Sequence, residues 1–331
     1  MEPLRVAIIG CGPRSYGHAK GVQVSGALSL KYACDIRPER VEKAALDWDV
    51  EAVADYRHIL DDPEIEAVLI VTDVQNHLPI VRDALAAGKH IICEKPFGDD
   101  VMLAREMVRC AEASDLVTYV NFQLRFMPKQ LATKRVAEEM DPVQIFFGRS
   151  RGMMRDHFLN PSTFCGIMDC CAHDFDQLAW LMGRNPTGVT AVVRRNTFTE
   201  DTGATDTISA LVDFGDGRSA TAVSSIGAAE IGSKFDIAGA LGNVTVARNG
   251  EVKAVRFGRN DSAGDKQAVE LELPQGANAD AELQRAFCAQ VREGTPSEAA
   301  TFRDGLNSLL LTVACLTSSD EGRRVALDEV Q

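Results

Sequence analysis

The stretch that decides the fold is Val6-Ala7-Ile8-Ile9-Gly10-Cys11-Gly12-Pro13-Arg14-Ser15, near the start of a chain of 331 residues. Its first four residues complete the apolar run Leu4–Ile9, which is typical of a buried parallel strand. The following G-x-G-x-x-S lets Gly10 make a tight turn and lets the backbone at Gly12 approach a pyrophosphate, beside a helix N-terminus that attracts phosphate. We predict a dinucleotide-binding strand–turn–helix, with Ser15 at a position that favours Gly or Ala. A chance glycine turn is the alternative.

Four further apolar runs follow, and the segments between them have helical patterns. The runs are Leu28–Cys34, Ala67–Val71, His90–Cys93 and Leu116–Phe122. None alternates strictly between apolar and polar residues, which suits strands buried on both faces. Helix signals between the runs include Asn76 as a cap and Asp99 or Asp100 as another. The alternation predicts right-handed βαβ units in a doubly wound parallel Rossmann sheet over residues 1–122.

After Phe122 the expected strands follow one another with no helix between them. They are Gln144–Arg149, Gly188–Arg195, Thr207–Phe214, Arg218–Ser225, Phe235–Gly239, Asn243–Ala247 and Val252–Phe257. Hairpin signals at Gly215-Asp216-Gly217 and Asn249-Gly250 indicate antiparallel pairing. The expected helices are Met127–Met140, Asp169–Leu181, Asp280–Glu293 and Phe302–Ser318, and Arg259–Gln275 is expected to be a surface loop. We predict an α+β domain over 123–331 with a mainly antiparallel sheet, for substrate binding and oligomerisation.

The charge of the chain excludes two classes of partner. A net charge of -13 argues against binding nucleic acid or an anionic membrane, both of which attract basic surfaces. No apolar stretch reaches about 18 residues, and the N-terminus has no apolar signal-peptide core. Nine scattered cysteines are typical of reduced intracellular thiols, so we expect a cytoplasmic protein.

The residues that end the second predicted strand favour NAD as the cofactor. Asp35 lies at the right distance after the glycine loop to accept hydrogen bonds from the adenosine ribose. A carboxylate there repels a 2′-phosphate, whereas Arg37 could pair with one, so NADP stays open. Asp35 could instead cap a helix that begins near Pro38.

The sequence Glu94-Lys95-Pro96 follows the predicted strand His90–Cys93 at the sheet edge where ligands of open α/β folds bind. A lysine at this edge can donate to a substrate hydroxyl and stabilise developing alkoxide charge. The ordinary alternative is an exposed lysine at a strand end.

A second candidate group, Asp169 and His173, stands four residues apart on a predicted helix and so shares one face. An imidazole of near-neutral pKa suits a general base that removes a hydroxyl proton, while the carboxylate orients the ring or binds substrate. By itself the pair would more simply be an ordinary helical ion pair.

With these motifs together, the whole chain resembles the Gfo/Idh/MocA oxidoreductases, named for glucose–fructose oxidoreductase and inositol dehydrogenase. The segments that carry the resemblance occur in the family's order and spacing. They are the G-x-G loop with His18, Thr72…Asn76-His77, Gly88-Lys89-His90…Glu94-Lys95-Pro96, Arg125-Phe126-Met127-Pro128, Asp169…His173…Asp176, Asp304-Gly305 and Glu321-Gly322-Arg323.

The resemblance implies a catalytic role for Lys95, an acid–base role for His173 and a companion role for Asp169. It also implies a cis peptide bond before Pro96 and an open-faced second sheet that forms homodimers or homotetramers. The cofactor-binding residues that we expect are Gly10, Gly12, Pro13, Arg14, Ser15, Asp35, Ile36, Arg37, Thr72, Asn76, His77, Glu94, Lys95 and Gln123. The expected substrate-binding residues are Lys95, Arg125, His157, Asp169 and His173.

Other features of the sequence have less specific interpretations. Asp73 stands where the family usually has Pro, beside the expected nicotinamide position. The basic residues Arg149, Arg151 and Arg155 either bind an anionic substrate group or form a solvated charged surface. A zinc site at the cysteines near His173 is disfavoured, because adjacent helical residues point about 100° apart and no C-x-x-C is present.

We therefore expect a dehydrogenase that oxidises a secondary hydroxyl of a sugar or cyclitol by hydride transfer to NAD. One alternative is a redox-neutral glycosidase, which would use tightly held NAD to oxidise a sugar transiently and eliminate a substituent. The other is a non-catalytic nucleotide-binding regulator on the same fold.

Overall fold

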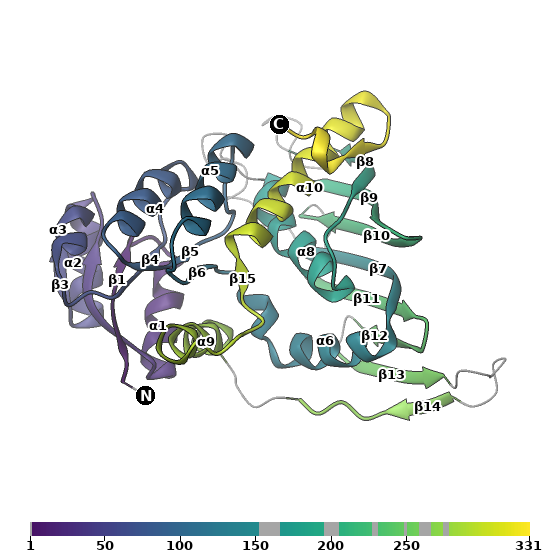
Figure 1. Ribbon diagram of the computed structural model, residues 1–331, viewed down its shortest axis with the longest axis horizontal. Helices are drawn as coiled ribbons and strands as arrows, with labels where there is room; N and C mark the ends of the chain where they lie inside the picture. The colour runs from purple at the N-terminus through teal and green to yellow at the C-terminus, as the bar shows by residue number, and fades with distance from the viewer. Residues whose placement is uncertain are drawn as a thin grey trace. The chain divides into compact units, whose positions relative to one another are not determined.

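The computed structural model describes residues 2–151, 166–194, 205–226, 231–247, 250–257, 266–273 and 278–331 (Figure 1). The chain forms two compact units. The first consists of Met1–Met127 and Gly276–Leu306, and the second of Pro128–Gln275 and Asn307–Gln331. The predicted domain boundary after residue 122 stays a prediction. The compact units are discontinuous in sequence, because residues 276–306 join the first one.

The first unit contains the predicted doubly wound sheet, with strand order β15-β6-β5-β4-β1-β2-β3. Its parallel strands are β1 (Leu4–Ile9), β2 (Leu28–Cys34), β3 (Glu51–Val53), β4 (Ala67–Ile70), β5 (His90–Cys93) and β6 (Thr118–Val120). The two-residue strand β15 (Ala300–Thr301) pairs antiparallel with β6 at one edge. All four residues of β4 and the last four of β1 are buried, as expected for strands covered on both faces.

Helices of the first unit alternate with its strands. They are α1 (Ser15–Ser25), α2 (Pro38–Trp48), α3 (Tyr56–Asp61), α4 (His77–Ala86), α5 (Val101–Glu112) and α9 (Ala279–Glu293), with short 3-10 turns η1 (Val74–Asn76) and η2 (Gln123–Phe126). Helices α4 and α5 begin after the predicted residues Asn76 and Asp100. Asp100 caps α5 by accepting a hydrogen bond from the backbone of Leu103 at 2.9 Å. Asn76 precedes α4, but its side chain makes no capping hydrogen bond.

Helix α9 lies beside α1, although about 250 residues separate them in the sequence (Figure 1). Phe287 and Leu283 of α9 are buried in the same apolar cluster as strand residues such as Ile8. The approach is close, because a Cβ added at Gly21 of α1 would lie 2.9 Å from the Gln284 side chain. Burial of this apolar face is what attaches α9 to the first unit.

The second unit contains a sheet of strand order β14-β13-β12-β11-β7-β10-β9-β8-β16. Its strands are β7 (Pro142–Arg151), β8 (Gly188–Arg194), β9 (Thr207–Gly215), β10 (Arg218–Ser225), β11 (Ile231–Gly239), β12 (Gly242–Val246), β13 (Val252–Phe257), β14 (Lys266–Val269) and β16 (Val325–Ala326). Among the described strands of this second sheet, only β7 and β10 pair in parallel. The sheet is therefore mainly antiparallel, as predicted. The expectation of a loop over Arg259–Gln275 was wrong for Lys266–Val269, since these polar residues complete the edge by pairing with β13.

Helices cover one face of this second sheet. Helix α8 (Gly166–Met182) packs on β7 and β10, and α6 (Pro128–Met140) packs on β11, β12 and β13 (Figure 1). Helix α10 (Phe302–Glu321) begins in the first unit and continues into the second. The alternating pattern of β9 buries Ile208, Ala210, Val212 and Phe214, as is typical of a half-buried strand.

Among the described residues of this second sheet, four large apolar side chains are exposed, and we call their surface the outer face. They are Phe146, Val192, Leu211 and Val223, with Leu211 54% exposed. Leu211 and Phe146 are both cross-strand neighbours of Thr221, and Val192 and Val223 are both neighbours of Ser209.

Within the described residues, no helix is long and apolar enough to cross a membrane.

Candidate cofactor and active site

The glycine loop between β1 and α1 has the geometry that a phosphate-binding turn requires. Gly10 adopts a φ of +101°, and a Cβ added there would lie 2.3 Å from the carbonyl oxygen of Val71. At Gly12 the nearest atom to an added Cβ is the Arg40 Nη1 at 3.9 Å, so the space beside this glycine is open. Ser15 is fully buried and donates its hydroxyl to the Gly12 carbonyl at 2.6 Å. This hydrogen bond explains how serine is accommodated where a smaller residue is usual.

Asp35, at the end of β2, is held by two backbone amides. Its Oδ2 accepts from Cys11 at 2.8 Å and its Oδ1 accepts from Arg37 at 2.9 Å. Asp35 therefore lies next to the glycine loop, and the N-cap of α2 is Arg37, not Asp35. The contact of Asp35 with the adenosine ribose stays a prediction. Ile36 is 87% exposed between Asp35 and Arg37, so the strand end presents a carboxylate and an apolar side chain together.

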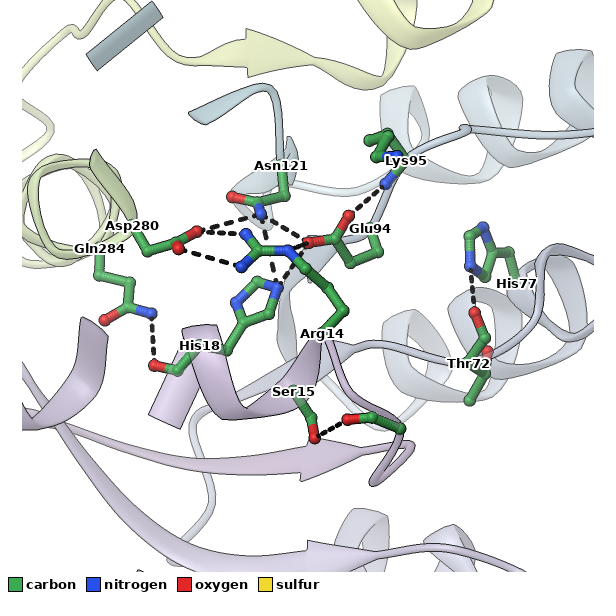
Figure 2. Close-up of polar contacts among 11 residues, drawn as sticks. Arg14, Ser15, His18, Thr72, His77, Glu94, Lys95, Asn121, Asp280 and Gln284 are labelled. Atoms are coloured by element: carbon green, nitrogen blue, oxygen red, sulfur yellow. Dashed lines mark hydrogen bonds and ion pairs between the residues drawn. The ribbon is translucent and has the colours of Figure 1, made fainter. Parts of the chain in front are cut away.

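Glu94, immediately after β5, is the centre of a buried polar cluster that Figure 2 shows. Its Oε1 accepts from Arg14 Nε at 2.7 Å, His18 Nε2 at 2.8 Å and Asn121 Nδ2 at 2.7 Å. Arg14 also makes a bidentate pair with Asp280 of α9, at 2.5 and 3.1 Å. The guanidinium of Arg14 is thus occupied by two carboxylates, and a direct contact of its side chain with the cofactor stays a prediction.

The charges around Glu94 keep it ionised. Burial opposes ionisation of this carboxyl, but Arg14, His18 and Lys95 outweigh the effect and hold the pKa of Glu94 well below its usual value. Its other oxygen, Oε2, accepts from the backbone amide of Lys95 at 2.9 Å. The Lys95–Pro96 peptide bond is cis, as the resemblance implied. Lys95 therefore starts from a fixed backbone position at the carboxyl end of β5.

The residues expected on the nicotinamide side follow β4. His77, at the start of α4, is fully buried, and its ring nitrogens lie 3.3 Å from the Thr72 carbonyl and 3.4 Å from the Phe97 carbonyl. Burial lowers the pKa of His77, which keeps the ring neutral near neutral pH. Asn76 and Asp73 are exposed at the two ends of η1.

Three buried oxygen atoms of this region have no hydrogen-bond partner within the described residues. They are Thr72 Oγ1, Asn121 Oδ1 and Gln123 Oε1. Buried polar atoms are rarely left unsatisfied, so such atoms indicate a ligand or water that completes their hydrogen bonds. Together with the open space at Gly12, they show that the residues present fit a dinucleotide.

Arg125, expected at the substrate, is buried in η2. Its guanidinium donates to the Glu298 carbonyl oxygen at 3.3 Å and lies 3.6 Å from Asp304. Both of these partners come from the C-terminal segment of the first unit. The predicted substrate contact of Arg125 therefore stays a prediction, while its observed contacts connect η2 to that segment.

In the second unit, α8 carries the predicted acid–base residue. His173 is buried, and the next residue, Asp174, lies between the helix and the sheet. Asp174 accepts hydrogen bonds from Arg149 of β7 at 3.1 Å and from Ser224 of β10 at 2.5 Å. Arg149, one of the three basic residues considered for anion binding, therefore pairs with a buried carboxylate of the protein itself.

Several predicted residues cannot be placed by the structure. The backbones of Asp169 and Arg151 lie in α8 and β7, but their side chains are outside the described residues. His157 and Arg155 lie wholly outside the described residues. The described cysteines are free thiols, mostly buried. Among the described side chains, no group of three potential ligands could hold a metal ion.

Sequence reasoning missed Asp280, Asn121 and Gln284. Asp280 and Gln284 lie on α9, and Gln284 donates to the His18 carbonyl oxygen at 3.2 Å (Figure 2). The sequence around Asp280 and Gln284 indicates only a helix with an acidic first turn. Nothing in it indicates that these residues contact the glycine loop and α1. Asn121 could have been noticed, because it ends a parallel strand at the same sheet edge as Glu94.

Comparison with known proteins agrees with this architecture. Residues 4–122 match the model of the oxidoreductase family with an NAD-binding Rossmann fold, GFO_IDH_MocA, and residues 160–327 match its C-terminal alpha/beta domain. The myo-inositol 2-dehydrogenase of Thermotoga maritima is 25% identical over 341 residues, covering 99% of each chain.

Two further relatives are similar over different shares of the chain. The scyllo-inositol 2-dehydrogenase (NAD(+)) of Bacillus subtilis is 30% identical over 227 residues. The matched region covers 65% of this chain and only 65% of the length of that relative. The solved complex of levoglucosan dehydrogenase with NADH and levoglucosan superimposes with a TM-score of 0.85 at 21% identity, over 98% of this chain and 99% of that one. The chain therefore belongs to the Gfo/Idh/MocA family of NAD-binding oxidoreductases.

Proposed function

We propose that the protein is an NAD-dependent dehydrogenase that oxidises a secondary hydroxyl of a cyclitol or sugar. The observation that carries the proposal is the Glu94–Lys95 pair, fixed at the carboxyl end of β5 beside the glycine loop. A lysine so placed serves as a hydrogen-bond donor at the edge where ligands of this fold bind. The relatives named inositol 2-dehydrogenase support a polyol as the substrate class.

In this mechanism the bound nicotinamide supplies the acceptor for the hydride, and the protein handles the proton and the developing charge. Lys95 donates a hydrogen bond to the reacting hydroxyl oxygen and stabilises its negative charge as the C–H bond breaks. His173 takes the hydroxyl proton as general base, and Asp169 binds the substrate beside it. Thr72 and Gln123 bind the cofactor through their unsatisfied oxygen atoms.

The cofactor specificity that we propose is for NAD over NADP. Both oxygens of Asp35 are oriented by backbone amides, so the carboxylate presents a fixed negative charge at the end of β2. Ribose hydroxyls can donate to this charge, whereas a 2′-phosphate would be repelled. Two structural neighbours were solved with NAD+ or NADH, which supports this preference. Arg37 is the residue that would have to move to accept NADP.

The outer face of the second sheet, defined above, supports a further proposal of self-association. Exposed apolar side chains on four neighbouring strands lose contact with water when a second copy covers them. We propose a homodimer or homotetramer formed through this face. A cytoplasmic location stays a prediction from the cysteine content.

The test is the near-ultraviolet absorbance of NADH, measured with NAD and separately with NADP, over a panel of inositols, aldoses and glycosides. We expect NAD to be reduced with at least one polyol, and Lys95→Ala and His173→Ala to lose the reaction. A glycoside cleaved without net NADH would favour the redox-neutral glycosidase. If the purified protein binds NADH but converts none of the compounds, the regulator becomes the better account.

A further inference from the structure

We propose that Asp280 of α9 is a positioning residue for Lys95, acting through Arg14 and Glu94. It holds the guanidinium of Arg14 against Glu94, and Glu94 in turn fixes the backbone of Lys95. The inference rests on the proposed function in so far as Lys95 is taken to bind the reacting hydroxyl. It gives α9 a role in positioning Lys95, although the two lie far apart in the sequence.

The contacts form one continuous path (Figure 2). Asp280 accepts two hydrogen bonds from the terminal nitrogens of Arg14, at 2.5 and 3.1 Å, which fixes the plane of the guanidinium. With its terminal nitrogens on Asp280, Arg14 directs Nε at Glu94, 2.7 Å away. Glu94 accepts the amide of Lys95 through its second oxygen, at 2.9 Å.

The two carboxylates of the path are largely buried, whereas the side chain of Arg14 between them is 33% exposed. The side chain of Glu94 is 5% exposed and that of Asp280 is 14% exposed, so neither is well screened by water. A buried carboxylate with three side-chain donors on one oxygen has few alternative positions. Asn121 contributes to the same arrangement, because its amide lies 3.3 Å from Asp280 as well as 2.7 Å from Glu94.

Charged groups of both signs lie along this path. Arg14 and Lys95 supply two positive charges and Glu94 and Asp280 supply two negative ones, with the neutral amide of Asn121 between the acids. If the charge of Asp280 were removed, Arg14 would attract Glu94 more strongly. Lys95 would also have less negative charge nearby. Both effects make the protonated form of Lys95 less favourable.

A second ion pair on α9 separates this role from simple attachment of the helix. Arg292, near the end of α9, makes a bidentate pair with Glu66 at 2.6 and 2.9 Å. Glu66 precedes β4, at the amino end of the strands, which is the opposite edge from Glu94. The Arg292–Glu66 pair is therefore a matched control, because it attaches the same helix to the same unit without contacting the proposed active site.

The experiment compares Asp280→Asn, Asp280→Glu and the control Glu66→Gln in the full-length protein. The first readout is the rate at which Lys95 is acetylated by acetic anhydride as a function of pH, followed by mass spectrometry. We expect the midpoint for Lys95 to shift to lower pH by about half a unit in Asp280→Asn and to stay unchanged in Glu66→Gln. Asp280→Glu should restore most of the wild-type midpoint.

The second readout is turnover with the best polyol. Asp280→Asn should lower kcat about tenfold with little change in the KM for NAD, since a misplaced donor acts on the reacting state. Equal losses in Asp280→Asn and Glu66→Gln, with an unchanged Lys95 midpoint, would overturn the inference and leave Asp280 a structural residue. If the wild-type enzyme reduces no NAD, the proposed function fails, whereas the Lys95 midpoint still decides the positioning role.

Discussion

Glu94 accepts hydrogen bonds from the side chains of Arg14 and His18, at the start of α1, and of Asn121, which follows β6. The sequence indicated its location through the Glu-Lys-Pro motif. It did not indicate the partners, because Asn121 and Asp280 come from other strands and helices. At the residue scale, a motif therefore predicts where a reactive group lies more reliably than what holds it.

The low pKa of Glu94 predicts a stability difference that depends on pH. A carboxyl whose folded pKa is depressed stabilises the native state above its unfolded pKa, about 4.3, and the contribution is lost as pH falls toward the folded value. Glu94→Gln should lower the free energy of unfolding by about 3 kcal/mol at neutral pH, and it should flatten the acid dependence. Denaturant melts from pH 7 to pH 3 measure both effects. Equal slopes for Glu94→Gln and wild type would contradict the charge assignment, with exposed Glu42→Gln as control.

The two loop glycines should respond differently to alanine. A Cβ at Gly10 meets the Val71 carbonyl oxygen and requires a left-handed backbone, so Gly10→Ala should lose about 2 kcal/mol or more of stability. Gly12→Ala has room for its methyl group, so the fold should persist while NADH affinity falls, because the methyl group occupies the approach to the pyrophosphate. Thermal melts and NADH fluorescence titrations separate the effects. Wild-type NADH affinity in Gly12→Ala would argue against this loop as the phosphate site.

At the scale of elements, predictability follows the apolar pattern. Strands β1, β2 and β5 begin and end where the sequence predicted, because each is a mainly apolar segment followed by a turn or a charged residue. Strand β14 was missed, because its residues are polar and its strand character comes only from pairing with β13. The packing of α9 on the first unit could not be predicted, because the apolar face of a helix does not indicate which core it packs against.

The attachment of α9 makes a prediction about Phe287, which is fully buried among strand side chains of the first unit. Phe287→Ala should cost about 3–5 kcal/mol, because it removes a large buried side chain and leaves a cavity. Leu46→Ala, at a residue that is 84% exposed on α2, should change stability by less than about 0.5 kcal/mol. Urea unfolding measures the two variants. Similar small losses in both would show that α9 contributes little to the core of the first unit.

At the scale of the whole molecule, the outer face of the second sheet predicts association. Leu211→Glu places a charge among Phe146, Val192 and Val223, where a second copy would bury it. We expect light scattering to give a dimer or tetramer for wild type and a monomer for Leu211→Glu. The matched control, Leu46→Glu, adds the same charge at an exposed apolar residue of the first unit and should leave the mass unchanged. A wild-type monomer at working concentration would contradict the proposal.

In the proposed reaction the protein transfers hydride from a polyol carbon to NAD. The most direct test uses the polyol that gives the highest rate, labelled with deuterium at the carbon that carries the reacting hydroxyl. Mass spectrometry of the reduced cofactor should show one deuterium per NADH formed, and Lys95→Ala should form almost none. Unlabelled NADH, or labelled substrate consumed without any net NADH, would contradict the account.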